Sequence, residues 1–242
     1  YYPTAPTEGG GGVPIFVHSE VLALDDRILM VSSCNTTNAS LGGWATVNGT
    51  DYAKVDGGVI TAFTAADYTN EDNAANWLDD QVISDAGGDA DTPFFGTVTG
   101  TKHLGGLKYT AAAESTVTIG AGETLGIDGT IIVASSVGAN DQTITGGSLT
   151  GGAGGSTLGI LQNGGARFTI GSTIVDNGGA TGFTKGGEGI VWLAGANTYT
   201  GVTTLSGGEL QVASLADAGL ASSIGAASAD SSNLVLESGM LH

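Results

Sequence analysis

Short runs in which apolar and polar residues alternate, each closed by glycine, recur along this chain. The clearest lies within residues 189–212, where Val191 and Leu193 alternate with Ile190 and Trp192. Successive side chains of a β-strand point to opposite faces, so each run offers one apolar face. The glycine breaks are too short to hold a helix and are typical of tight bends. Strand, bend and strand in this order predict one coil of a parallel β-solenoid.

Further runs of this kind fill the C-terminal part of the chain. They cover residues 97–99, 107–110, 116–119, 124–127, 130–133, 142–145, 157–161, 167–170, 172–175 and 233–237. Similar starts near Thr116, Gln142, Arg167 and Thr198 are about 25 to 31 residues apart, within the range of solenoid repeats. The sequence therefore predicts an all-β chain, a right-handed parallel β-solenoid (β-helix) with an irregular, strand-rich N-terminal cap.

The N-terminal part is less regular and divides the chain into three predicted regions. Residues 1–12 contain two prolines and four consecutive glycines and are expected to form a flexible leader. Residues 13–93 are expected to form a cap or docking region; it opens with strand-length apolar runs within 13–33. Residues 65–80 are its best helix candidate. Residues 94–242 are the predicted solenoid, in which 213–232 leave the coil as a loop or short helix.

Composition narrows the class of protein. The chain of 242 residues has 43 glycines without a triplet period, which excludes collagen. Its mean hydropathy of +0.18 argues against a disordered low-complexity tract. The net charge is −18, and such a surface repels nucleic acid and anionic membranes. No apolar run approaches the roughly 20 residues that span a bilayer.

The stretch 189–212 also carries a resemblance. Its pattern G-x-V-x-L-x-G-A-N-T-Y-T-G-x-T-T-L-x-x-G-x-L-x-V resembles the autotransporter-associated β-strand repeat of bacterial passenger domains and surface proteins. Looser similarity extends to residues 173–182, 144–151 and 43–50. The resemblance implies a secreted β-helix, located outside the cell or at the bacterial cell surface, that presents a surface or adhesive structure.

An acidic stretch is the best candidate for a metal site. Asp79, Asp80, Asp85, Asp89 and Asp91 lie within thirteen positions that are interrupted by two glycines. Carboxylate oxygens are the ligands that Ca²⁺ prefers, so a calcium loop is one interpretation. The other is a solvated acidic loop, which binds nothing. A solenoid held together by stacked coils needs no cofactor, so calcium is the only one that the sequence suggests.

An enzyme is the rival that must be weighed, because some polysaccharide-degrading enzymes are β-helices. Asp128, Asp141 and Asp176 lie on different predicted coils and could meet across a sugar. Each, however, sits beside a glycine or asparagine turn, where Asp is expected for its hydrogen bonds to the backbone. The few basic residues do not cluster. The sequence favours a protein without catalytic residues.

The outer face of the 189–212 coil suggests a contact surface. If Val191 and Leu193 fill the core, Ile190 and Trp192 point outward, and an exposed Trp beside Ile is a typical binding contact. The alternative is that segment 213–232 folds over them.

Together these features predict a non-catalytic extracellular rod. It would assemble end to end with other copies into filaments or form part of a longer surface rod. The alternative is an adhesin passenger domain that binds a host or glycan ligand.

Overall fold

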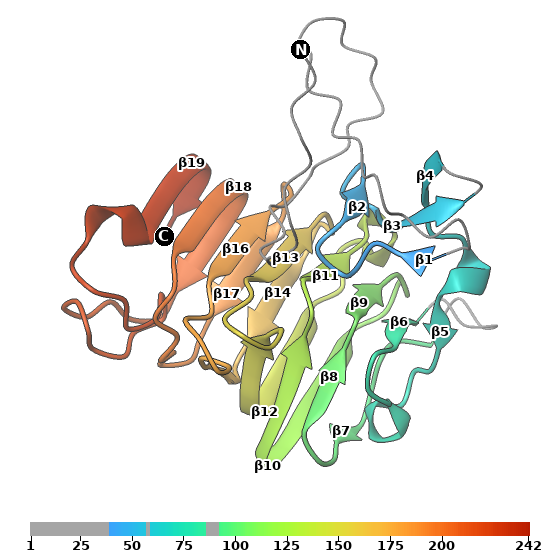
Figure 1. The fold of residues 1–242 in the computed structure, drawn as a ribbon, viewed down its shortest axis with the longest axis horizontal. Coiled ribbons are helices and arrows are strands. Elements are labelled where there is room, and N and C mark those ends of the chain that lie inside the picture. The colour runs from blue at the N-terminus through green and yellow to red at the C-terminus, as the bar shows by residue number, and fades with distance from the viewer. Residues whose placement is uncertain (1–38, 57–58, 86–91) are drawn as a thin grey trace, which may run out of the picture.

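The computed structural model describes residues 39–56, 59–85 and 92–242 (Figure 1). The expected leader, 1–12, and the apolar runs within 13–33 lie outside the described residues. The described chain forms an antiparallel sheet of four strands and a larger, mostly parallel sheet of fifteen. In this part of the chain, no helix has the length and apolarity that crossing a bilayer requires.

The large sheet is a parallel β-solenoid, as the glycine-closed alternation predicts. In Figure 1 its strands lie side by side as successive rungs. Its strands are β5 (Thr69–Asn70), β6 (Val82–Ser84), β7 (Thr97–Val98), β8 (Lys102–Leu104), β9 (Gly106–Tyr109), β10 (Ser115–Ile127), β11 (Thr130–Val133), β12 (Gln142–Gly151), β13 (Leu158–Gln162), β14 (Arg167–Ile170), β15 (Thr173–Ile174), β16 (Phe183–Gly186), β17 (Ile190–Leu193), β18 (Thr203–Val212) and β19 (Leu234–Leu241). The fold is thus a right-handed β-helix, the predicted class.

Apolar rows run through the interior from coil to coil. In one row Val117 pairs with Ile144, Ile144 with Ile170, and Ile170 with Leu193. All four side chains are fully buried. Each coil therefore buries the apolar face of its neighbour, and this stacking, with the backbone bonds between coils, stabilises the fold.

The coils do not keep the repeat length that the sequence suggested. Thr116 pairs with Thr143, which directly follows the predicted start at Gln142. The first two predicted starts are therefore aligned to within one residue. Arg167, however, pairs with Ile190 rather than with the region of Thr198. Paired residues are 26 positions apart from Gln142 to Phe168, 23 from Arg167 to Ile190 and 19 from Ile190 to Glu209, but 31 from Glu209 to Met240, across the loop 213–232. A fixed spacing therefore misplaces the last start.

The expected helix over residues 65–80 is not formed. The structure has two 3₁₀ turns there, η1 (Ala65–Asp67) and η2 (Ala74–Asn76). The Asn73 side chain accepts from the Ala75 N–H, and the Trp77 indole, fully buried, donates to the Glu71 carbonyl. Side-chain bonds of this kind offer the backbone an alternative to a helix. The parallel strands β5 and β6 flank η2, so parallel pairing reaches upstream of residue 94.

Segment 213–232 leaves the coil as a loop. It holds no strand, and the short turn η4 (Ser231–Asn233) follows at its end. An antiparallel bridge joins Ser222 of this loop to Asn197.

The strand-rich cap is an antiparallel sheet on the flank of the solenoid. Its strands are β1 (Ala39–Ser40), β2 (Thr46–Val47), β3 (Asp51–Asp56) and β4 (Val59–Ala62). Tyr52 of β3 is fully buried, and its hydroxyl accepts from the Leu107 N–H of β9 at 2.8 Å. Tyr52 and Phe63 pack against Ile132, which points outward from β11. The cap therefore covers the outer face of β9 and β11.

Candidate functional site

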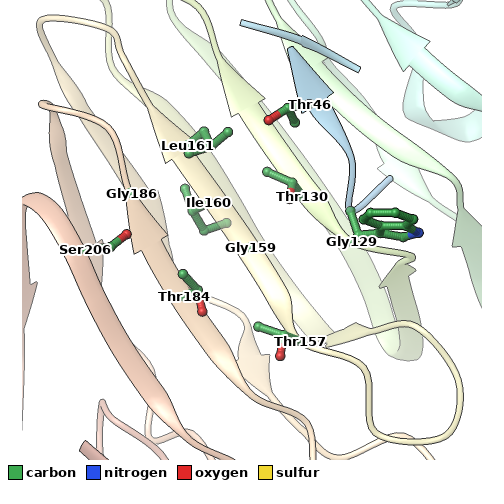
Figure 2. Close-up of a pocket in the computed structure, with 11 residues that line it drawn as sticks. Thr46, Gly129, Thr130, Thr157, Gly159, Ile160, Leu161, Thr184, Gly186 and Ser206 are labelled. Carbon is green, nitrogen blue, oxygen red and sulfur yellow. The ribbon is translucent and has the colours of Figure 1, made fainter. Parts of the chain in front are cut away.

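A groove lies where the cap meets the outer face of the solenoid (Figure 2). Its volume is about 130 Å³, and mainly apolar atoms form its surface. In Figure 2 the side chains of Thr130, Leu161 and Thr184 stand on neighbouring strands of this face. The complete lining is Trp44, Thr46, Gly129, Thr130, Thr157, Gly159, Ile160, Leu161, Thr184, Gly186 and Ser206.

Glycines make this part of the outer face shallow. Gly159 occupies an outward position of β13, between the buried Leu158 and Ile160. A Cβ added at Gly186 of β16 would lie 2.9 Å from the Leu161 side chain, which also lines the groove. At Gly129 the cap approaches so closely that an added Cβ would lie 2.2 Å from the Gly43 backbone. Gly129 also has φ +137, which side-chain-bearing residues rarely adopt. The junction of cap and coil therefore depends on glycine.

A larger cavity of about 600 Å³ adjoins the same junction. Trp44 lines both cavities and is 41% exposed. The larger cavity is also lined by Asp80 and Asp128, both on the exposed surface. Neither cavity has a Lys, Arg or His among its lining residues. The sequence analysis missed Trp44; its only signal there was a tryptophan directly after two glycines.

The acidic stretch is not gathered into one cluster as far as it is described. The Asp79 side chain accepts from the His103 N–H at 2.7 Å. Asp85 is buried elsewhere, where its carboxylate contacts Thr110 and Ala111. Asp89 and Asp91 lie outside the described residues. Within residues 39–56, 59–85 and 92–242, no three His, Cys, Asp or Glu side chains are placed to hold a metal ion. Calcium binding stays a prediction.

Asp85 has a structural role in its present position. Its Oδ1 accepts from the Thr110 N–H, the Thr110 hydroxyl and the Ala111 N–H. Burial raises the pKa of the Asp85 carboxyl, against these hydrogen bonds, which lower it. Its Oδ2 is buried and has no hydrogen-bond partner among the residues that the structure describes. Asp85 thus joins two coils at an electrostatic cost.

The outer row of β17 has the predicted orientation. Val191 and Leu193 are fully buried, while Ile190 and Trp192 are partly exposed on the opposite side. The Arg167 guanidinium lies 4.3 Å from the centroid of the Trp192 ring, a cation–π contact. Whether Ile190 and Trp192 contact a ligand stays a prediction.

The three carboxylates considered for sugar cleavage are in different settings. Asp141 accepts from the Arg167 N–H. Asp176 accepts from the Thr181 and Thr200 backbone. Asp128 lines the larger cavity instead. Asp141 and Asp176 thus accept backbone hydrogen bonds, as expected for Asp, but the donors Arg167 and Thr200 lie on the following coil and only Thr181 lies in the same bend.

Buried polar side chains mark the bends of the 189–212 coil. Asn197 is fully buried; its Oδ1 accepts from the Ile174 N–H at 2.8 Å and its Nδ2 donates to the Ser223 carbonyl at 2.6 Å. The side chain therefore ties together the coil before it and the loop after it. The Tyr199 hydroxyl is hydrogen-bonded to that of Thr203.

Lys185 is a buried cation that the sequence analysis did not single out. Its position in β16 pairs with Ile160 on one side and Leu205 on the other, so it continues an inward apolar row. Its ammonium donates to the Gly187 carbonyl at 2.5 Å and to the Gly207 carbonyl at 2.8 Å. Burial lowers the pKa of Lys185 from 10.5 to about 8.

Comparison with known proteins identifies the class. Residues 183–212, the stretch that holds these bends, match the passenger-associated-transport-repeat family. This stretch is therefore a repeat of the autotransporter passenger type, and it places the chain at the cell surface, outside the cell.

A particular relative is the adhesin BmaC autotransporter of Brucella suis biovar 1 (strain 1330), which is 64% identical over 216 residues. The match covers 89% of this chain and 6% of the adhesin, so the chain spans a small part of the relative's length. No solved structure matches the chain.

Proposed function

We propose that the chain is a non-catalytic segment of an extracellular bacterial adhesin rod, with contacts for a host or glycan ligand on its outer surface. The observation that carries this proposal is the stack of parallel coils with a continuous apolar core. Such a stack holds outward side chains on a rigid, elongated support, which suits the presentation of a binding surface. The relative's name, an adhesin, supports the same role.

The last strand supports assembly into a longer rod. In β19 the side chain of Leu236 is 57% exposed, although it continues the inward row that includes Leu205. Met240 is 59% exposed on the same strand. An open strand edge with exposed apolar side chains is a surface for further pairing. A further coil of a longer rod would cover it, and a second copy stacked end to end is the alternative.

Attachment of coated beads tests the adhesin role. Beads carrying the purified chain should bind to an epithelial monolayer more than beads carrying albumin or the heat-unfolded chain. Equal attachment of all three would contradict the proposal. Trp192→Ala on the same beads tests the predicted contact at the outer row of β17, since a ligand held there should bind less.

Negative-stain electron microscopy and sedimentation test end-to-end assembly. Filaments that Leu236→Asp abolishes would support pairing between copies through β19. Separate short rods at every concentration would exclude filaments of this chain. The remaining interpretation would be that the chain is a segment of a longer rod. Incubation with neutral and acidic glycans, followed by detection of new reducing ends or unsaturated products, tests the non-catalytic assignment, which any turnover would contradict.

A further inference from the structure

We propose that the two cavities beside Trp44 bind a basic segment of a partner protein, with a Lys or Arg head group at Asp80 and Asp128 and its aliphatic stem against Trp44. This inference rests on the proposed adhesin role and names the chemistry of one contact. It concerns a surface distinct from Ile190 and Trp192.

Trp44 is held as a fixed platform between the two cavities. The Gly43 carbonyl accepts from the Thr130 N–H at 2.9 Å, which ties the preceding residue to β11. The Ala45 N–H donates to the Gly42 carbonyl at 3.1 Å and closes a turn around Trp44. An exposed indole on an anchored backbone loses little conformational freedom on binding, which favours its use as an anchor.

The negative charge that lines the larger cavity favours a positively charged head group in the ligand. Asp80 and Asp128 line it without a basic side chain among the lining residues. Elsewhere in the described chain, Asp67 is paired with Lys54 at 2.7 Å, and Asp51 is paired with Lys108. Neither Asp80 nor Asp128 has an ion pair among the described residues. A chain with net charge −18 also attracts a basic partner over distance.

The smaller cavity specifies the rest of the ligand. Its surface is mainly apolar, with the Leu161 side chain and threonine methyl groups around it. An aliphatic stem or a neighbouring apolar side chain fits such a surface. A saccharide would use the tryptophan face but not the apolar cavity and the uncompensated charge, so it is the less favoured occupant.

Fluorescence anisotropy with a defined probe tests the inference. The probe is a short labelled peptide of arginine and leucine, and its control replaces each arginine by citrulline, which keeps the shape and removes the charge. The wild-type chain should bind the arginine peptide, and its affinity should fall as salt is added. Trp44→Ala should weaken binding about tenfold, and Asp128→Asn or Asp80→Asn about threefold each.

Matched variants separate this site from the general negative charge. Asp80 has φ 64, a conformation that asparagine tolerates, so Asp80→Asn should leave the fold intact. Asp217→Asn removes one charge from the exposed loop 213–232 and should change affinity less than about twofold. Leu215→Ala removes an exposed apolar side chain from the same loop and should leave peptide binding unchanged.

Three results would overturn the proposal. They are an absence of arginine-peptide binding, equal binding of the citrulline peptide, and equal weakening by Asp217→Asn and Asp128→Asn. Binding of cellohexaose that depends on Trp44, without binding of the peptide, would assign the groove to a saccharide instead. If the coated beads attach to cells and the peptide does not bind, the adhesin role stands and this inference fails.

Discussion

Replacing Asn197 by alanine should destabilise the chain more than any other single polar truncation in the 189–212 coil. The side chain is fully buried and makes two hydrogen bonds, one to the Ile174 N–H and one to the Ser223 carbonyl. Alanine can make neither bond, and the surrounding backbone leaves both groups buried. The effect should therefore reflect two unsatisfied groups as well as the lost contacts.

The expected magnitude follows from those two groups. A buried donor or acceptor left without a partner costs about 1–3 kcal/mol. Asn197→Ala should thus lower the free energy of unfolding by about 3 kcal/mol. With a urea m-value of about 3 kcal/mol per M, the midpoint should fall by about 1 M.

Urea denaturation and hydrogen exchange measure this effect globally and locally. The Ile174 amide should exchange faster in the variant because it loses its acceptor. Thr198→Ala is the matched control: Thr198 is exposed and adjacent, so its change should stay within about 0.5 kcal/mol. Asn197→Asp should be at least as destabilising as alanine, because it buries a negative charge and places a carboxylate oxygen against the Ser223 carbonyl, to which it cannot donate. A midpoint for Asn197→Ala equal to that of Thr198→Ala would refute the reasoning.

Three further predictions concern buried charge and calcium. Burial lowers the pKa of Lys185 from 10.5 to about 8, so the unfolded chain binds this proton more tightly and the free energy of unfolding should rise between about pH 8 and 10. Urea titrations across that range should show the rise in wild type and not in Lys185→Met; the same slope in both would contradict the assignment. For Asp85, burial raises the pKa, so its charge costs stability as pH rises above the usual carboxyl range, and Asp85→Asn should be more stable than wild type at neutral pH. If urea denaturation shows that Asp85→Asn is less stable than wild type, this prediction is wrong. If the acidic stretch that begins at Asp79 binds calcium, millimolar Ca²⁺ should raise the melting temperature and a chelator should reverse the change; an unmoved transition would exclude this site.

The local pattern of apolar, polar and glycine residues was sufficient to predict the β-helix and the direction of its side chains. The alternation of Val191 and Leu193 with Ile190 and Trp192 is a property of neighbouring residues, and the structure keeps its parity. The same holds for the bends, because glycine spacing limits what the backbone can do between two strands. The helix predicted over 65–80 was wrong because side-chain hydrogen bonds of Asn73 and the burial of Trp77 compete with helical pairing.

Contacts between distant residues were decided only by the tertiary structure. The cavities at Trp44 arise because Gly43 meets Gly129, residues 86 positions apart in the chain, and no local pattern reports that approach. Lys185 looks like a surface residue in sequence, yet its register beside Ile160 and Leu205 turns it inward towards two carbonyls. Alternation and glycine spacing act within one coil, and so determine what each coil is; register and the docking of the cap act between coils, and so determine which side chains meet.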